Sequence, residues 1–160
     1  QWPEPTQGVS VLSGAFVTLH KVVDGKRLLR GCIGHIDARS SVYETVKTVA
    51  YSAAFQDFRF PPLTAEELPS IELEISVISP FERVRNTEEI EPGKHGLFIK
   101  LGARSGLLLP QVASERNWDR ETFLAQTCLK AGLAEDAWKD SNAEISCFTA
   151  EVFDESTATM

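Results

Sequence analysis

The 160-residue sequence lacks the features of several protein classes. Its only cysteines, Cys32, Cys128 and Cys147, are odd in number and form no CxxC pair, which argues against a disulfide framework. No apolar run approaches the roughly 18 to 20 residues that span a bilayer. The first residues contain neither the basic nor the apolar segment of a signal peptide. We therefore expect a cytoplasmic protein with free thiols and no membrane segment.

Positive charge is also scarce. Sixteen Lys and Arg residues stand against 23 Asp and Glu residues, a formal net charge of -7. This charge disfavours non-specific nucleic-acid binding, so RNA is a possible partner only through a small local basic site. A hydrophobic content of 42% with 24% charged residues is typical of a globular domain. At this length one core suffices, so we predict a single domain over residues 1–160 with a loose polar tail at 154–160.

Several segments have the composition of antiparallel strands. Residues 14–21 are rich in Phe, Val, Thr and Leu, and Asp24-Gly25 then predicts a tight hairpin. A period-two alternation over residues 70–79 predicts a strand with one buried and one wet face. Further strands are expected over residues 96–101 and 107–109, on either side of a flexible tip at 102–106, and over 145–153.

Capping signals predict helices between these strands. Ser41 begins a helix that must end within residues 55–59, because a diproline follows. A shorter helix is expected from Thr64, and Asp119 begins another that Gly132 ends. Antiparallel groups of strands interrupted by helices favour an α+β fold, mainly an antiparallel sheet with flanking helices, and leave a division into two subdomains open.

The best candidate site is the hexapeptide Leu29–Gly34, Leu-Arg-Gly-Cys-Ile-Gly, expected as a turn at the end of the second strand. Gly31 and Gly34 there permit an unusual φ or the close approach of another group. The reactive form of cysteine is the thiolate, and Arg30 or backbone N–H groups would lower the pKa of Cys32 below ~8.5. Cys32 is therefore a candidate nucleophile. The alternative is a small buried cysteine at a strand end.

Two histidines are candidate general bases for this thiol. The imidazoles of His35 and His95 titrate near neutral pH and could accept its proton, even from a distant part of the sequence. The alternative for each is a surface or turn histidine, because neither lies in a specific catalytic motif.

The segment Asp57–Pro62 contains an acid, a base and two aromatic residues before a diproline. Held rigidly, Arg59 could bind a carboxylate or phosphate, so we include Asp57 and Arg59 with Arg30, Gly31 and Gly34 as candidate substrate-binding residues. The alternative is that Arg59 pairs with Asp57 while the phenylalanines anchor the loop. No P-loop, dinucleotide fingerprint or metal-binding spacing is present, so we predict no metal site and assign no cofactor.

With these segments identified, the chain resembles the AMMECR-type domain family from about Gly14 to Phe153. The hexapeptide is the most specific part of the resemblance. The other matching segments, in the order of the family, are residues 14–19 (Gly-Ala-Phe-Val-Thr-Leu), Asp57 with residues 59–63 (Arg-Phe-Pro-Pro-Leu), Glu67-Leu68, His95-Gly96, residues 109–113 (Leu-Pro-Gln-Val-Ala) and 130–133 (Lys-Ala-Gly-Leu).

The resemblance implies a two-part α+β fold and a functional role for the hexapeptide. Prokaryotic members look like protein A of the AmmeMemoRadiSam system, which also includes a Memo-like and a radical-SAM protein. Any metal or radical chemistry would then belong to such a partner. Members usually carry a helix ahead of the first strand, and we expect that helix to be absent here.

Two hypotheses follow. The first is an enzyme, or an enzyme component, that acts on a nucleotide, RNA or another anionic small substrate with Cys32 as a thiolate. The second is a non-catalytic module that binds RNA or a protein partner through the surface shaped by the hexapeptide. The sequence favours neither decisively, because the site is polar but lacks a complete catalytic signature.

Overall fold

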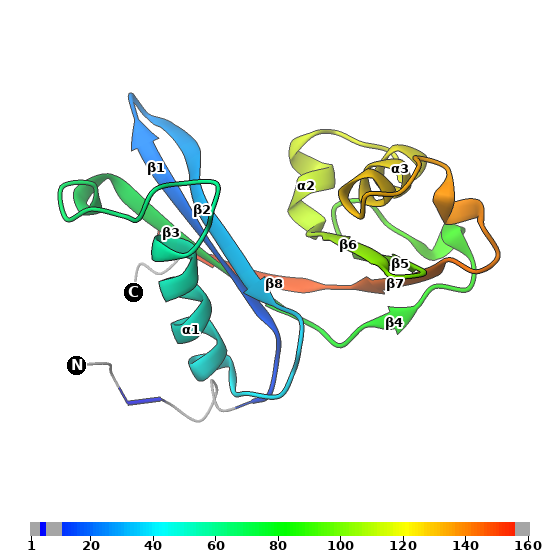
Figure 1. Cartoon of the computed structure of the whole chain (residues 1–160), viewed down its shortest axis with the longest axis horizontal. Helices are drawn as coiled ribbons and strands as arrows, with labels where there is room; N and C mark the ends of the chain where they lie inside the picture. Colours follow the sequence, from blue (N-terminus) through cyan, green and yellow to red (C-terminus); the bar gives the residue numbers. More distant parts are fainter. Residues whose placement is uncertain (1–3, 6–10, 156–160) are drawn as a thin grey trace. The chain divides into compact units, whose positions relative to one another are not determined.

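The structure is a computed structural model that describes residues 4–5 and 11–155, and the chain divides into two compact units (Figure 1). Residues up to 78, with those from 151 onward, form the first unit, and residues 79–150 form the second. The described residues form two antiparallel sheets of four strands. The predicted α+β class is therefore confirmed.

The first sheet has the strand order β2-β1-β3-β8. Its strands are β1 (Ala15–Val23), β2 (Lys26–His35), β3 (Ile71–Ile78) and β8 (Ala150–Asp154). Helix α1 (Val42–Phe55) packs on one face of this sheet (Figure 1). The core between them is built from small and branched side chains that are almost fully buried, namely Val17, Leu19, Val49 and Ala53. Small residues on the helix allow its backbone to approach the sheet closely.

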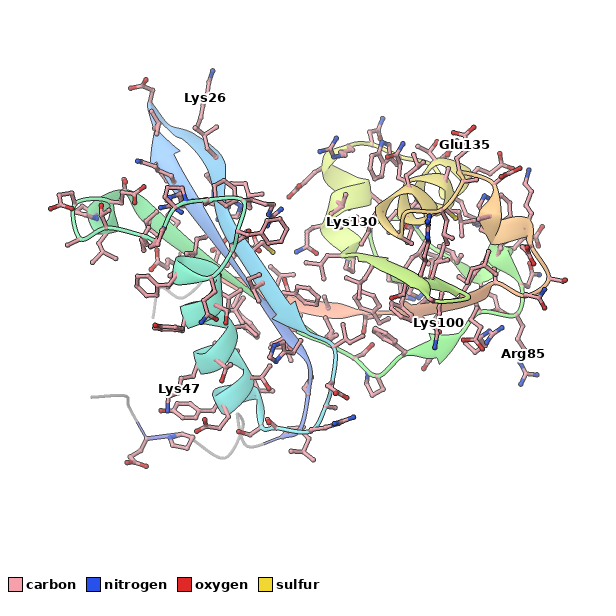
Figure 2. The ribbon with its side chains drawn as sticks, viewed as in Figure 1. Lys26, Lys47, Arg85, Lys100, Lys130 and Glu135 are labelled. Carbon is pink, nitrogen blue, oxygen red and sulfur yellow. The ribbon has the colours of Figure 1, made fainter. Side chains whose placement is uncertain are left out.

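Local signals for this unit agree with the sequence. Asp24 and Gly25 have φ values of 50° and 74°, as the tight turn between β1 and β2 requires, and Lys26 follows at the tip of the hairpin (Figure 2). Ser41 caps α1 by accepting a hydrogen bond from the N–H of Glu44 at 3.3 Å. Both predictions are confirmed.

The second sheet has the strand order β4-β7-β5-β6. Its strands are β4 (Glu82–Arg83), β5 (Gly96–Leu101), β6 (Arg104–Leu108) and β7 (Glu144–Phe148), accompanied by the helices α2 (Pro110–Glu115) and α3 (Arg120–Lys130). The core of this unit includes the fully buried Leu97, Ile99, Phe123 and Leu124. Short 3-10 helices occur at Leu68–Ser70, Thr87–Glu89 and Ala137–Lys139. None of the helices among the described residues is long and apolar enough to cross a bilayer.

Some sequence predictions for the second unit are confirmed and others need correction. Asp119 caps α3 and Gly132 follows its end with a φ of 74°. The tip between β5 and β6 is shorter than expected, because residues 104–106 already belong to β6. Pro110, directly after this hairpin, begins the helix α2, a position that tolerates proline because the first helical N–H has no partner.

Two further predictions were wrong. The helix expected from Thr64 is a turn followed by a short 3-10 helix, because Pro69 comes too soon for another α-helical turn. The strand expected over residues 145–153 is divided between β7 and β8, which belong to different sheets. The division occurs at Thr149, whose backbone N–H donates to the Ser79 hydroxyl at 2.8 Å and whose carbonyl accepts from the Ser79 N–H at 2.9 Å.

Two expectations concern the chain ends. Asp154 is the last residue of β8, and residues 156–160 of the predicted loose tail lie outside the described residues. Most of the segment ahead of β1, where we expect the usual helix of the family to be missing, also lies outside them.

Candidate functional site

The hexapeptide lies within β2, which is an edge strand, and not in a turn at the end of a strand as expected. In the pairing of β1 with β2, Leu19 faces Gly31 and His20 faces Leu29, so Arg30 is the extra residue of a β-bulge. Neither glycine of the hexapeptide has a positive φ. The extended backbone therefore forms no anion-binding nest of successive N–H groups.

Both glycines instead permit a close approach. A Cβ atom on Gly31 would overlap the carbonyl oxygen of Ala53 in α1, and one on Gly34 would overlap the ring of Phe16 on β1. Gly31 thus lets the helix lie against the strand, and Gly34 leaves room for the aromatic ring. The sequence suggested that these glycines permit either an unusual φ or the close approach of another group, and the structure supports the close approach.

The free edge of β2 is closed at Cys32 by an ion pair. The N–H of Cys32 donates to Asp57 Oδ2 at 3.0 Å, and Arg59 Nη2 donates to the Cys32 carbonyl at 3.3 Å. The two side chains also bind each other, with Arg59 Nη2 2.7 Å from Asp57 Oδ2. Asp57 is only 4% exposed, and the Arg59 guanidinium holds the pKa of its carboxyl well below the usual range. The pair takes the place of a neighbouring strand.

The same carboxylate shapes a tight turn. Asp57 Oδ1 accepts hydrogen bonds from the backbone N–H of Arg59 at 3.1 Å and from its Nε at 2.9 Å. The Phe60 N–H donates to the Asp57 carbonyl at 3.0 Å. The alternative suggested for this segment is therefore confirmed for the pairing of Arg59 with Asp57 but wrong for Phe58, which lies at the tip of the turn, is 96% exposed and does not anchor the loop. Phe60 is partly buried, with the Arg30 and Arg59 guanidiniums 5.8 and 5.5 Å from its ring centre.

Arg30 fastens the following loop to β2. Its Nε and Nη2 donate to the two carboxylate oxygens of Glu67 at 2.9 and 3.0 Å, and Nη2 also donates to the Pro61 carbonyl at 2.8 Å. Lys21 contacts the same carboxylate at 3.2 Å. The hydrogen bonds from Arg30 help to lower the pKa of Glu67 to about 2. Arg30 is 7% exposed, and its Nη1 is buried with no partner among the described residues. The positive charge of Arg30 is therefore neutralised by Glu67 within the first unit.

The Cys32 thiol lies next to the Thr18 hydroxyl, with 3.3 Å between Sγ and Oγ1. Burial raises the pKa of this thiol, an effect that the Thr18 hydrogen bond and the Arg59 charge only partly offset. The nearby carboxylates of Asp57 and Glu74 raise it further. The direction is opposite to the one expected for an activated thiolate.

The two candidate bases lie in different parts of the chain. The pairing from Thr18–Cys32 to Ala15–His35 is regular, and side chains alternate along a strand, so His35 projects from the opposite face of the sheet to Cys32. His95 belongs to the second unit, where its Nδ1 accepts a hydrogen bond from the N–H of Glu91 at 3.0 Å. A role for His95 as the base for Cys32 stays a prediction.

Four residues in or near this site were not among the site residues predicted from the sequence. Thr18 faces Cys32 on one side and Glu74 on the other, so the three side chains form a row across β2, β1 and β3. Their strands could be read from the alternation, but the register that aligns them could not. Glu67, the partner of Arg30, lies 37 positions away in sequence, and its place in the Glu67-Leu68 match to the family did not indicate this pairing. Ser76, on the supposedly wet face of β3, is buried.

Comparisons with known proteins identify the family. A model of the AMMECR1 family matches residues 3–153. The chain belongs to the AMMECR1 family. It is 44% identical over 158 residues to Protein MK0488 of Methanopyrus kandleri, which covers 94% of this chain and 75% of that protein. It is 47% identical over 149 residues to Protein TK0174 of Thermococcus kodakarensis, which covers 89% of this chain and 72% of that protein.

A solved structure supports both the AMMECR1 assignment and the fold. The crystal structure of Uncharacterized Protein PH0010 from Pyrococcus horikoshii matches with a TM-score of 0.88 at 38% identity. The match covers 97% of this chain and 81% of that one. The family resemblance of the sequence is thereby confirmed. Within the described part of the chain, no three or more His, Cys, Asp or Glu side chains are grouped so as to hold a metal ion.

Alkylation tests the state of the Cys32 thiol. Because its pKa is raised, we expect the rate of reaction with iodoacetamide on the folded protein to rise only at a pH above the ~8.5 of a free cysteine. Site-resolved mass spectrometry would measure this, with Cys147 as the half-buried control. Selective reaction of Cys32 near neutral pH would restore the thiolate hypothesis.

The stability of the protein in acid tests the Arg30–Glu67 pair. The folded-state pKa of Glu67 is lowered, so its contribution is present above the unfolded value of about 4.3 and is lost as the pH falls towards 2. We expect Glu67→Gln to be less stable than the wild type at pH 7 and to lose less stability between pH 5 and 2. Urea unfolding at each pH would measure it, with exposed Glu66→Gln as the control. Parallel pH profiles for Glu67→Gln and the wild type would contradict the pair.

Proposed function

We propose that this AMMECR1-family protein is a partner-binding module whose hexapeptide and 57–67 loop form a rigid platform for another protein. The observation that carries the proposal is the turn at Phe58. This side chain is 96% exposed, yet its two neighbours, Asp57 and Arg59, are held by hydrogen bonds to each other, and Arg59 also donates to the Cys32 carbonyl of β2. A large aromatic side chain on a rigid turn loses little entropy on binding, which is typical of interface hot spots.

The distribution of apolar side chains supports the same function. Among the described residues, thirteen large hydrophobic side chains are exposed, and all except Leu129 belong to the first unit. Leu28 and Leu29, in and beside the hexapeptide, are 52% and 45% exposed. Single exposed apolar residues are ordinary, but such a concentration in one unit favours a protein-binding surface.

The chemistry of the hexapeptide gives less support to an enzyme with Cys32 as its thiolate. Arg30, Asp57 and Arg59, the residues expected to bind an anionic substrate, use most of their hydrogen-bonding groups to fasten the loop to β2. The pKa of the Cys32 thiol is raised, which favours its neutral form. These groups fit a role in positioning the platform better than a role in nucleophilic attack.

The expected partners come from the family resemblance. As protein A of the AmmeMemoRadiSam system, the chain would bind a Memo-like protein or a radical-SAM protein in the cytoplasm, where free cysteines persist. RNA is the weaker candidate, because the first unit carries twelve Asp and Glu residues against seven Lys and Arg residues.

Replacing Phe58 tests the platform. We expect Phe58→Ala to weaken binding of the immobilised Memo-like or radical-SAM protein by ten-fold or more, in line with a hot-spot loss of about 2 kcal/mol. Its melting temperature should not fall, because the side chain is almost fully exposed. The matched control is Leu129→Ala, an exposed apolar position on α3.

Biolayer interferometry would provide these affinities. Equal binding of both partners by wild type and Phe58→Ala, or binding of neither partner by the wild type, would contradict the proposal. Tight binding of single-stranded RNA that Phe58→Ala leaves intact would favour the RNA alternative.

A further inference from the structure

A separate cavity of about 180 Å3 lies in the second unit, at one end of its sheet. Its lining includes Glu82, His95, Cys147 and Thr149. One water molecule needs about 10–15 Å3 of such space, so the cavity has room for a small organic molecule. None of these groups takes part in the platform of the first unit.

The strand register explains why these side chains meet. Cys147 on β7 faces Glu82 on β4 and Leu97 on β5, so all three project from the same face of the sheet. Continuing the β5–β7 register by two residues from this pair places His95 opposite Thr149, again on that face. Leu97 belongs to the apolar core of this unit. Glu82, Cys147 and His95 lie on the same face of the sheet, next to the edge of that core.

Hydrogen bonds hold two residues of the cavity lining, His95 and Thr149, in place. His95 Nδ1 accepts the Glu91 N–H at 3.0 Å, and the His95 N–H donates to the Glu91 carbonyl at 2.9 Å. The accepting Nδ1 carries no proton, so the neutral ring presents Nε2–H as a donor. On the other side, Thr149 is fixed by its two backbone hydrogen bonds to Ser79.

The charge of the lining restricts the ligand. Glu82 is an acceptor, and the described residues that line the cavity include no Lys or Arg. Burial and the Glu82 charge both raise the pKa of the Cys147 thiol, so this group stays neutral. A carboxylate or phosphate ligand would therefore meet a carboxylate without a compensating cation, whereas a neutral ligand with its own N–H donor would not.

We propose that this cavity binds a small neutral molecule with an N–H donor and an acceptor side by side, as in a primary carboxamide. The amide NH2 group would donate to Glu82, and the carbonyl oxygen would accept from His95 Nε2–H. Pro80 in the lining supplies an apolar surface for the rest of the ligand. This site is independent of the partner-binding platform.

Nicotinamide and nicotinate form a matched pair of probes, because they differ only in the carboxamide and the carboxylate. We expect nicotinamide to shift the NMR resonances of the His95 ring and the Thr149 amide saturably and to slow alkylation of Cys147. Nicotinate should do neither. Glu82→Gln and His95→Gln should each weaken nicotinamide binding at least ten-fold. Glu88→Gln, at an exposed carboxylate of the same unit, and Phe58→Ala should bind as the wild type does.

The proposal would be overturned if nicotinamide left these resonances unmoved, if nicotinate bound equally well, or if both cavity variants retained wild-type affinity. Thermal melts of each variant would show whether the fold is intact. Because Glu82 is exposed on the short strand β4, Glu82→Gln should keep the wild-type melting temperature even if His95→Gln does not.

Discussion

The Asp57–Arg59 ion pair is the interaction on which the proposed platform depends. One carboxylate accepts the Cys32 N–H and orders the turn that follows α1, while the guanidinium binds the Cys32 carbonyl. An edge strand with unpaired N–H and C=O groups can pair with other chains. At Cys32 the ion pair provides hydrogen-bond partners for both groups. The geometry of the Phe58 turn and the closure of the β2 edge therefore have a common cause.

Much of the fold could be predicted from local signals. The Asp24-Gly25 turn and the Ser41 and Asp119 caps all depend on residues close together in sequence, and these predictions were confirmed. One of the wrong predictions, by contrast, depended on a distant contact. The strand over residues 145–153 had the right composition, but the hydrogen bonds between Thr149 and Ser79, 70 positions apart, mark its division between two sheets.

Contacts between residues distant in sequence also limited what could be predicted of the candidate site. Its residues could be named from the sequence, including Arg30, Cys32, Asp57 and Arg59, but their functions depend on their partners. The bulge at Arg30 and the long-range pairing with Glu67 give Arg30 a positioning role, whereas the sequence suggested an effect on the Cys32 thiol. His35 is three residues from Cys32, yet the alternation of the strand places it on the other face. Spacing alone could not resolve register, bulges or ion pairs.

The measurement that tests this account most directly is the hydrogen-exchange rate of the Cys32 backbone amide, followed by NMR in the wild type and in Asp57→Ala. The account predicts that the wild-type amide is protected although β2 is an edge strand, and that Asp57→Ala loses this protection while the amide of Ile33, whose residue pairs with Val17, keeps it. Equal protection of Cys32 in the two proteins would contradict the role of the ion pair in closing the edge and ordering the site.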